Sequence, residues 1–349
     1  MVVHTPIRQR ARNPFFRDLR PGIRTLIRSL SAILLSMQLF LGAVSAHASE
    51  YTAEDWLSRM MMAARDQSYR GDFVYSNGLT LKSMRIVHTI QEHDELQRIY
   101  TLNGTPREVV RHGDRLEVRQ ADGQSSHFIQ PSHAAPFPML SAREINDLEP
   151  HYDLKLLDSS RVAERICQGV ALIPRDSLRY GHRLWLDEET GLLLRAQLLG
   201  TSGEVLEELL FTEIHMEEGD TAWSPADQQQ TAPAKTQARV DVPENQQTWR
   251  LDSPPPGFKR VAYLRHRASD SDAPAENLVF SDGVATVSVY IGPEIGAHGK
   301  VEGLSRMGAT HTYGFRTAQG QHIMVVGEVP AETAEWIANA VGPTERVSD

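Results

Sequence analysis

The stretch Asp72–Ile90, DFVYSNGLTLKSMRIVHTI, decides how the first part of this chain folds. Two β-prone runs flank the pair Asn77-Gly78. Asn-Gly between such runs is a strong hairpin signal, because a tight turn requires positive φ angles that these two residues tolerate. We therefore expect two antiparallel strands that meet at this pair.

The same signal repeats along the chain. Further turn pairs stand at Asn103-Gly104, Gly113-Asp114 and Asp122-Gly123. After them come the β-prone runs HYDLKLLD, RVAERICQGVALI, YGHRLWLD, LLLRAQLLG and EVLEELLFTEIHM. The pattern predicts an antiparallel meander of about ten strands. A sheet of this size must curl and cover its apolar face with helices or with a ligand.

One helix is expected before the meander. Thr52 and Asp55 form the T-x-x-D pattern of a capped helix start, and apolar residues including Trp56 and Met60 follow at helical spacing. The methionines suit either a lipid-binding lining or core packing. A short helix at 141–148 follows a Pro-rich loop, PSHAAPFPM, which contains Phe137 and could serve as a lid.

The first 48 residues have the pattern of a secretory signal peptide. Seven arginines and one aspartate precede the apolar run SLSAILLSMQLFLGAV, which ends at the small-residue site Ala46-His47-Ala48. We expect export to the periplasm and cleavage after Ala48. A retained membrane anchor is the alternative, although the run is short for a span.

The remainder of the chain is acidic. The whole chain has a net charge of −9 and residues 1–48 contribute +6, so the rest carries −15. A protein of this charge has no generic affinity for nucleic acid or for an anionic membrane. An acidic partner would have to meet a local basic patch.

Residues 217–247 are predicted to be a linker, because they are rich in Gln, Ala and Pro and lack apolar periodicity. It separates a domain at 49–216 from a smaller α+β domain at 248–349. In the smaller domain, Ser281-Asp282-Gly283 is interpreted as the corner of a two-residue hairpin, without a chemical role for the aspartate. The closing run AETAEWIANAV predicts a helix whose apolar face includes Ile337 and Val341.

The sequence contains no recognisable catalytic motif or metal-ligand spacing, and we expect neither an enzyme nor a bound cofactor. The single cysteine, Cys167, lies among apolar residues and is expected to be a buried core residue. One thiol cannot form a disulfide within the chain, so the fold must be stabilised by its core.

A basic stripe is the best candidate for a binding surface. In FKRVAYLRHR, strand alternation puts Lys259, Val261, Tyr263, Arg265 and Arg267 on one face. Such a stripe fits an acidic peptide. A solvated edge strand protected by its charges is the alternative interpretation.

Several extended stretches resemble the RseB/MucB family of sigma-E regulatory proteins. They are YTAEDWLSRMMMAARDQSYRGDFVY and RLWLDEETGLLLRAQLLGTSGEVLEELLFTEI in the first domain, and FSDGVATVSVYI, MGATHTYGF and IMVVGEVPAETAEWIANAV in the second. The resemblance covers essentially the whole exported chain. It implies a large domain similar to LolA and LolB, which is a curved antiparallel half-barrel with helices and an apolar cavity, and a smaller α+β domain.

The resemblance also implies a function. Family members bind the periplasmic domain of a RseA/MucA-type anti-sigma factor and shield it from proteolysis, and lipid or lipopolysaccharide fragments release it. A periplasmic lipid or lipoprotein carrier is the alternative, and homo-oligomerisation is left open. We expect the lipid cavity to be lined by Trp56, Met60, Phe73, Met84, Phe128, Phe137, Trp185 and Phe211. We expect the anti-sigma factor to contact Tyr263, Arg265, Arg267 and Tyr290, which are chosen from alternation and charge.

Overall fold

The computed structural model describes residues 51–91, 94–113, 115–120, 125–129, 145, 147–217, 236–237, 240–267, 274–292 and 302–344. These residues belong to one compact unit that begins at Tyr51. None of the helices in these ranges is long and apolar enough to cross a membrane. The predicted signal peptide, the Pro-rich loop with Phe137 and most of the predicted linker lie outside the described residues.

Helix α2 (Ala53–Asp66) begins where the sequence predicted it. The backbone N–H of Asp55 donates to Thr52 Oγ1 at 3.2 Å, and the N–H of Thr52 donates to Asp55 Oδ2 at 2.8 Å. This reciprocal capping box satisfies two backbone groups that the helix itself leaves unpaired. The helix buries Trp56 and Met60 against the sheet.

The larger sheet contains twelve strands among the described residues. They are β1 (Tyr69–Ser76), β2 (Leu81–Gln91), β3 (Asp94–Thr101), β4 (Arg107–His112), β5 (Arg115–Gln120), β6 (Ser125–Ile129), β7 (Tyr152–Val162), β8 (Arg165–Pro174), β9 (Gly181–Asp187), β10 (Leu193–Leu199), β11 (Val205–Met216) and β12 (Thr236–Gln237).

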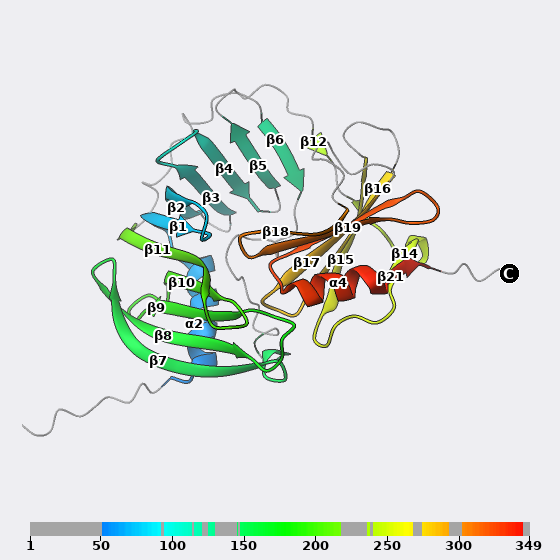
Figure 1. Cartoon of the computed structure of the whole chain (residues 1–349). Helices are drawn as coiled ribbons and strands as arrows, with labels where there is room; N and C mark the ends of the chain where they lie inside the picture. Colours follow the sequence, from blue (N-terminus) through cyan, green and yellow to red (C-terminus); the bar gives the residue numbers. More distant parts are fainter. Residues whose placement is uncertain are drawn as a thin grey trace, which may run out of the picture. The chain divides into compact units, whose positions relative to one another are not determined.

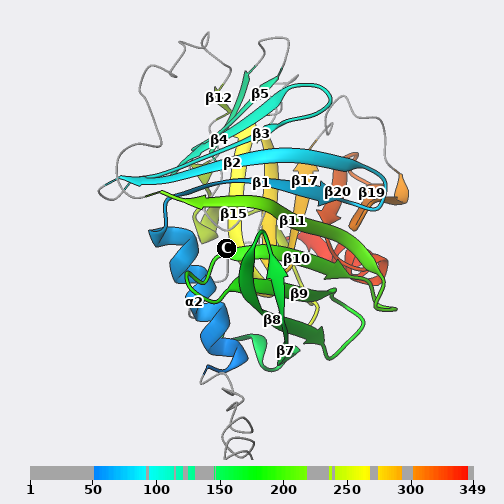
Figure 2. The ribbon, with the colours of Figure 1, turned by 90° about the vertical axis from the view of Figure 1, so that its left-hand side faces the viewer.

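The sheet is built from two antiparallel meanders, β1–β6 and β7–β11, which join where β1 pairs with β11. Among the strands that the structure describes, only the short contact between β12 and β6 is parallel. The end strands β12 and β7 do not pair with each other, so the sheet stays open. Figures 1 and 2 show the sheet curving, with α2 lying against its β7–β10 part.

The predicted turn at Asn77-Gly78 joins β1 and β2. Gly78 has a φ of 77°, the left-handed conformation that favours glycine. Ser76 pairs with Leu81, so the turn contains four residues. The Asn77 side-chain oxygen accepts the N–H groups of Leu79 and Thr80 at 3.2 and 2.9 Å, which explains why asparagine suits this corner.

The smaller sheet has the order β13-β15-β16-β17-β20-β19-β18, with two further strands paired separately. The elements are β13 (Val240–Asp241), the 3-10 turn η4 (Glu244–Gln246), β14 (Trp249–Leu251), β15 (Lys259–Arg267), β16 (Pro274–Ser281), β17 (Thr286–Gly292), β18 (Gly303–Met307), β19 (Thr310–Arg316), β20 (His322–Gly327), α4 (Ala331–Ala340) and β21 (Val341–Pro343). Strands β12 and β13 and η4 therefore fall within the stretch predicted as a linker.

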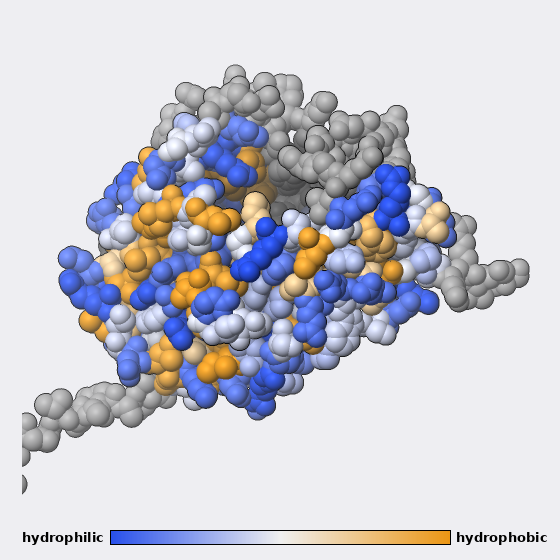
Figure 3. Space-filling model, in the orientation of Figure 1, coloured by the Kyte–Doolittle hydropathy of each residue, from blue (hydrophilic) through white to orange (hydrophobic). Residues whose placement is uncertain are grey.

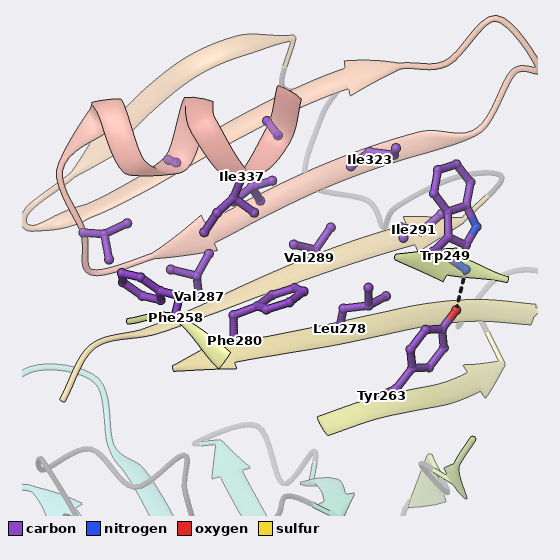
Figure 4. Packing of buried hydrophobic residues seen from close by; sticks show 14 of the residues in the cluster. Trp249, Phe258, Tyr263, Leu278, Phe280, Val287, Val289, Ile291, Ile323 and Ile337 are labelled. Carbon is purple, nitrogen blue, oxygen red and sulfur yellow. Dashed lines mark hydrogen bonds between the residues drawn. The ribbon is translucent and has the colours of Figure 1, made fainter. Parts of the chain in front are cut away.

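Helix α4 covers one face of the smaller sheet. Ile337 packs there among Phe258, Phe280, Val287 and other side chains of a single buried cluster (Figure 4). Val341, predicted to continue the helix, instead caps it and begins β21, although its half-buried side chain packs on the same cluster.

The prediction of a two-residue corner at Asp282-Gly283 was wrong. Ser281 pairs with Thr286, so four residues make the turn, and Gly283 has a φ of 100°. Asp282 Oδ1 accepts the N–H groups of Val284 and Ala285 at 2.9 and 2.8 Å. The carboxylate thus holds the longer turn closed, as an Asx-type cap does.

The fold class predicted from the sequence is confirmed. The chain is α+β, with a large curved antiparallel half-barrel sheet around a helix and a smaller α+β part at the C-terminal end.

Candidate functional site

Tyr263 and Arg265, two of the residues expected to meet a partner, are engaged within the smaller domain. Tyr263 is 4% exposed, and its hydroxyl donates to Glu276 while it accepts the N–H groups of Thr248 and Trp249 (Figure 4). Burial, and then the hydrogen bond to Glu276, raise the pKa of this phenol. Tyr263 therefore lies in the core and stays a neutral donor.

Arg265 lies next to Tyr263 on the same carboxylate. Its guanidinium is 2.7 Å from Glu276 Oε1 and also donates to the Gln246 carbonyl at 3.1 Å. The side chain is half-buried. Arg265 thus fixes η4 to β15 and β16, and it offers a partner only the part of its guanidinium that these contacts leave exposed.

A β-bulge explains why the stripe differs from the alternation pattern. Arg260 pairs with Phe280 and Ala262 pairs with Val279, so Val261 is the extra residue on β15. A bulge moves the following residues to the opposite face relative to the preceding ones. Lys259 is therefore not in register with Tyr263, and it bonds instead to Asp147 of the larger domain at 2.8 Å.

Tyr290, like Arg265, is half-buried. It pairs with Asn277 on β16 and with Met324 on β20, in a row that alternates with the core-facing Val289 and Ile291. Its side chain lies on the sheet face opposite to α4. Arg267 ends β15, and its side chain is outside the described set.

The apolar residues expected to line a lipid cavity belong to two neighbouring clusters. Trp56 and Met60 pack with Leu172 and Leu184, whereas Phe73 and Phe211 pack with their ring centres 5.5 Å apart in the second cluster. Ala196 is half-buried against both clusters. The structure thus brings the helix residues and the strand residues into one continuous apolar layer.

Met84 and Trp185 differ in position. Met84 pairs with Phe73 and is half-buried on the second cluster. Trp185 belongs to that cluster too. It pairs with Arg195 on the neighbouring strand β10, and the guanidinium of Arg195 lies 4.4 Å from the indole centre. Leu184 occupies the alternate row, so the two side chains of β9 point to opposite faces. Phe128 lies on β6 with its side chain outside the described set. Phe137 lies outside the described residues.

The turn between β8 and β9 forms a contact that the sequence did not predict. Arg179 is fully buried, and its guanidinium is 2.6 Å from Asp282 Oδ2, which is fully buried as well. It also donates to the Pro256 carbonyl at 2.6 Å and to Asp176 Oδ1 at 3.0 Å. One arginine of the larger domain thereby satisfies two acceptors of the smaller one.

Aromatic and polar groups enclose this ion pair. The Tyr152 hydroxyl donates to Asp282 Oδ2 at 3.1 Å, and the guanidinium of Arg179 lies 5.6 Å from the Tyr152 ring and 5.5 Å from the Phe258 ring. Burial, together with the Asp282 charge, raises the pKa of Tyr152 well above its ordinary value. Thr333 at the start of α4 donates to the Leu178 carbonyl at 2.6 Å.

A second contact lies beside the first. Glu207 on β11 accepts the hydroxyl of Tyr75 at 2.6 Å and the backbone N–H of Ala309 at 3.3 Å. Ala309 is buried with Tyr180 and Leu206 in a small apolar cluster. The β18–β19 turn is therefore bound to the larger sheet through both a carboxylate and apolar packing.

The single thiol of the chain lies in the core. Cys167 is fully buried, and burial raises the pKa of its thiol to about 12, which keeps it protonated. Among the residues that the structure describes, no three His, Cys, Asp or Glu side chains are close enough to hold a metal ion.

Asp282 therefore has a structural role that extends beyond its own turn. Its carboxylate closes the turn and also neutralises a buried arginine. The only signal in the sequence was the pair Arg179 and Asp282 next to turn residues, and 103 positions separate them. Contacts of that separation are not visible in local patterns.

Comparison with known proteins gives a consistent result. The family model for the MucB/RseB N-terminal domain matches residues 52–236, and the one for the MucB/RseB C-terminal domain matches residues 243–342. The sigma factor AlgU regulatory protein MucB of Pseudomonas aeruginosa is 33% identical over 320 residues, which are 88% of this chain and 97% of that protein. The sigma-E factor regulatory protein RseB of Escherichia coli K12 is 25% identical over 319 residues, covering 89% and 98%.

A solved structure agrees with these relatives. The crystal structure of MucB in complex with MucA(peri) has a TM-score of 0.62 and 33% identity, and the match covers 84% of this chain and 99% of that one. The two family models together cover most of the chain, in the same order as its two sheets. The chain belongs to the MucB/RseB family.

Proposed function

We propose that this protein is a periplasmic negative regulator of an envelope-stress sigma factor. It binds the periplasmic region of a membrane anti-sigma factor and shields that region from regulated proteolysis. The observation that carries this proposal is the match over 99% of a MucB chain solved in complex with MucA(peri). A chain that retains the whole length and fold of such a protein retains the scaffold on which the complex forms.

The proposal includes export and a lipid signal. The start of the chain has the pattern of a signal peptide cleaved after Ala48. The continuous apolar layer that contains Trp56, Met60, Phe73, Met84 and Phe211 supports a lipid or lipopolysaccharide fragment as the releasing ligand. Trp185, Phe128 and Phe137 stay predicted contacts of that ligand. By linkage, a lipid that prefers the partner-free state lowers the affinity for the anti-sigma factor, and the partner lowers the affinity for lipid.

For the anti-sigma factor we propose a surface at the end of β15 that includes Arg265 and Arg267, with Tyr290 as a separate contact on the other face of the smaller sheet. Tyr263 supports this surface from the core, because its hydroxyl positions Glu276 beside Arg265. Arg179 and Asp282 form an ion pair that joins the two domains. We therefore expect a structural change in the larger domain to alter the conformation of the smaller one. The domain division proposed from the sequence, at 49–216 and 248–349, is retained.

Protease protection tests the proposal. The periplasmic domain of the cognate anti-sigma factor is incubated with the site-1 protease, with and without this protein and with added lipopolysaccharide fragment. We expect cleavage to slow with the protein and to resume with the lipid. Unchanged cleavage, together with transfer of lipid between vesicles, would support the carrier alternative instead.

The surface requires variants that leave the fold intact. Charge reversal of Arg265 would put two carboxylates together at Glu276, so Arg265→Gln and Arg267→Glu are the better changes, with Arg250→Gln as a control for an exposed pair with Asp252. We expect Arg267→Glu to weaken protection and to reduce its salt sensitivity. Equal protection by all three variants would remove these arginines from the site.

A further inference from the structure

Exposed apolar side chains gather at one end of several strands. They lie on or beside four turns, β1–β2, β3–β4, β10–β11 and β18–β19. Leu79 is 74% exposed, Leu81 66% and Met307 70%. We call the set the apolar rim; its members are Leu79, Leu81, Leu102, Val205 and Met307.

The turns of the apolar rim are neighbours in space. A Cβ built on Gly308 would lie 3.4 Å from Asn77, and one built on Gly78 would lie 3.5 Å from the Leu206 carbonyl oxygen. The N–H of Leu102 donates to the Ser83 carbonyl at 2.8 Å. Figure 3 shows hydrophobic surface over the β1–β2 and β11 region and again at β18. The rim is therefore one surface that comes from distant parts of the chain.

The backbone of these turns is satisfied from within. Asn77 Oδ1 accepts two N–H groups of its turn, and Asn103 Oδ1 accepts the N–H of Ser83 at 3.0 Å. The Arg306 guanidinium donates to the Gly308 carbonyl at 2.7 Å. Internal satisfaction of polar backbone groups is the condition for placing a turn where water is scarce.

The exposure and the charge of the apolar rim indicate which kind of partner covers it. Leu79, Leu81 and Met307 are each at least 66% exposed, so the rim does not enclose a peptide side chain. Lys82 and Arg306 are exposed cations beside the rim, but Glu204 is also exposed there and the chain after residue 48 carries −15. Such a protein is repelled by an anionic surface, whereas a surface without net charge admits apolar insertion.

We propose that the apolar rim inserts into the interface of a zwitterionic phospholipid bilayer. The leucines and the methionine enter the boundary between headgroups and acyl chains, while the capped turns limit the loss of backbone hydration. Association is driven by apolar burial and depends little on salt. This membrane contact is separate from the proposed anti-sigma factor surface, and either can fail without the other.

Vesicle flotation tests the proposal with a chain beginning at Ser49, so that the apolar export signal is absent. The probe is a vesicle of phosphatidylethanolamine and phosphatidylcholine, with increasing phosphatidylglycerol in a second series. The test variant is Leu79→Ser/Leu81→Ser. The matched control is Ile166→Ser/Ile173→Ser, which removes two exposed apolar residues from β8, Ile166 being 52% exposed.

We expect the test variant to bind neutral vesicles at least about tenfold more weakly, since burying one leucine is worth about that factor. The control should bind like the parent, and phosphatidylglycerol should weaken binding at low salt. A dye on Leu79→Cys should shift to the blue on vesicles, while the same dye on Ile166→Cys should not. Labelling is selective because Cys167 is buried.

Three results would overturn the proposal. One is a parent chain that does not float with neutral vesicles. Another is equal loss of binding in the test and control variants, which would indicate general hydrophobicity. The third is unchanged flotation of Leu79→Ser/Leu81→Ser with lost protection of the anti-sigma factor, which would make the rim a protein contact.

Discussion

Replacing Asp282 by asparagine tests the role assigned to the contact between the two sheets. The asparagine has nearly the same shape, and its oxygen can still accept the N–H groups of Val284 and Ala285. What disappears is the negative charge 2.6 Å from Arg179, in a place where both side chains are fully buried. The acceptor Oδ2 disappears too, because the amide group that replaces it faces the donors of Arg179 and Tyr152. The change therefore removes the ion pair and its hydrogen bonds while it keeps the turn.

The expected magnitude follows from the surroundings of Arg179. Removing one partner of a buried ion pair costs about 3–5 kcal/mol, because a charge is left without compensation. Arg179 keeps Asp176 and the Pro256 carbonyl, so we expect the lower end, a loss of about 3 kcal/mol in the free energy of unfolding.

Asp153→Asn is the matched control. Asp153 on β7 pairs at 2.7 Å with Arg175, the first residue after β8, but both side chains are about half exposed. An exposed pair of this kind contributes less than about 1 kcal/mol. The difference between the losses in unfolding free energy of the two variants therefore measures the effect of burial on an Arg–Asp ion pair.

Urea unfolding, followed by tryptophan fluorescence and by circular dichroism, gives these values from the midpoint and slope. The cycle is completed with Arg179→Met and the double variant, which should be less destabilised than the sum of the single variants by about 2 kcal/mol. The reasoning is refuted if Asp282→Asn unfolds like Asp153→Asn, or if the two single effects simply add.

Three further predictions follow from the structure. Burial, and then the charge of Arg179, lower the pKa of His151, so the folded state disfavours its protonation; stability should fall as pH drops below about 6.5, and His151→Gln should flatten that slope in unfolding curves between pH 7 and 5. Gly257→Ala should cost more than Gly104→Ala in the same denaturation assay, because both have positive φ but only the first would place a Cβ 2.5 Å from His151; equal losses of about 1 kcal/mol would mean that backbone strain alone acts. Cys167 should react with a thiol reagent at pH 8 only as fast as the chain unfolds, and rapid labelling of the native protein would contradict its burial.

The strand order within each meander could be predicted because its signals are local. Asn77-Gly78 and Asn103-Gly104 lie between strands that are neighbours in sequence and in the sheet, and the residues at these corners meet a requirement of their own turn. The capping box at Thr52 is local in the same sense. The pairing of β1 with β11, which joins the two meanders, was not predicted, because strands that lie so far apart in the sequence leave no local signal of their contact.

The nominated binding residues show where alternation stops being informative. A single extra residue, Val261, changes which side chains share a face with Tyr263, and no composition rule announces a bulge. Tyr263 was chosen for its place in a basic stripe, yet its hydroxyl is held in the core beside Glu276. For Arg265 the sequence showed the charge correctly but could not show its carboxylate partner on the next strand.

The burial of Asp282 has a consequence for how the chain can be divided. Its carboxylate meets Arg179 and Tyr152, which both belong to the larger domain, and the same arginine also donates to the Pro256 carbonyl. During synthesis from the N-terminus, the arginine is made first and remains hydrated until the last third of the chain folds onto it. In a fragment limited to the smaller sheet, Asp282 would face water and keep only its hydrogen bonds to the N–H groups of Val284 and Ala285. The substitution of Asp282 by asparagine should therefore change the free energy of unfolding very little in the fragment and strongly in the whole chain.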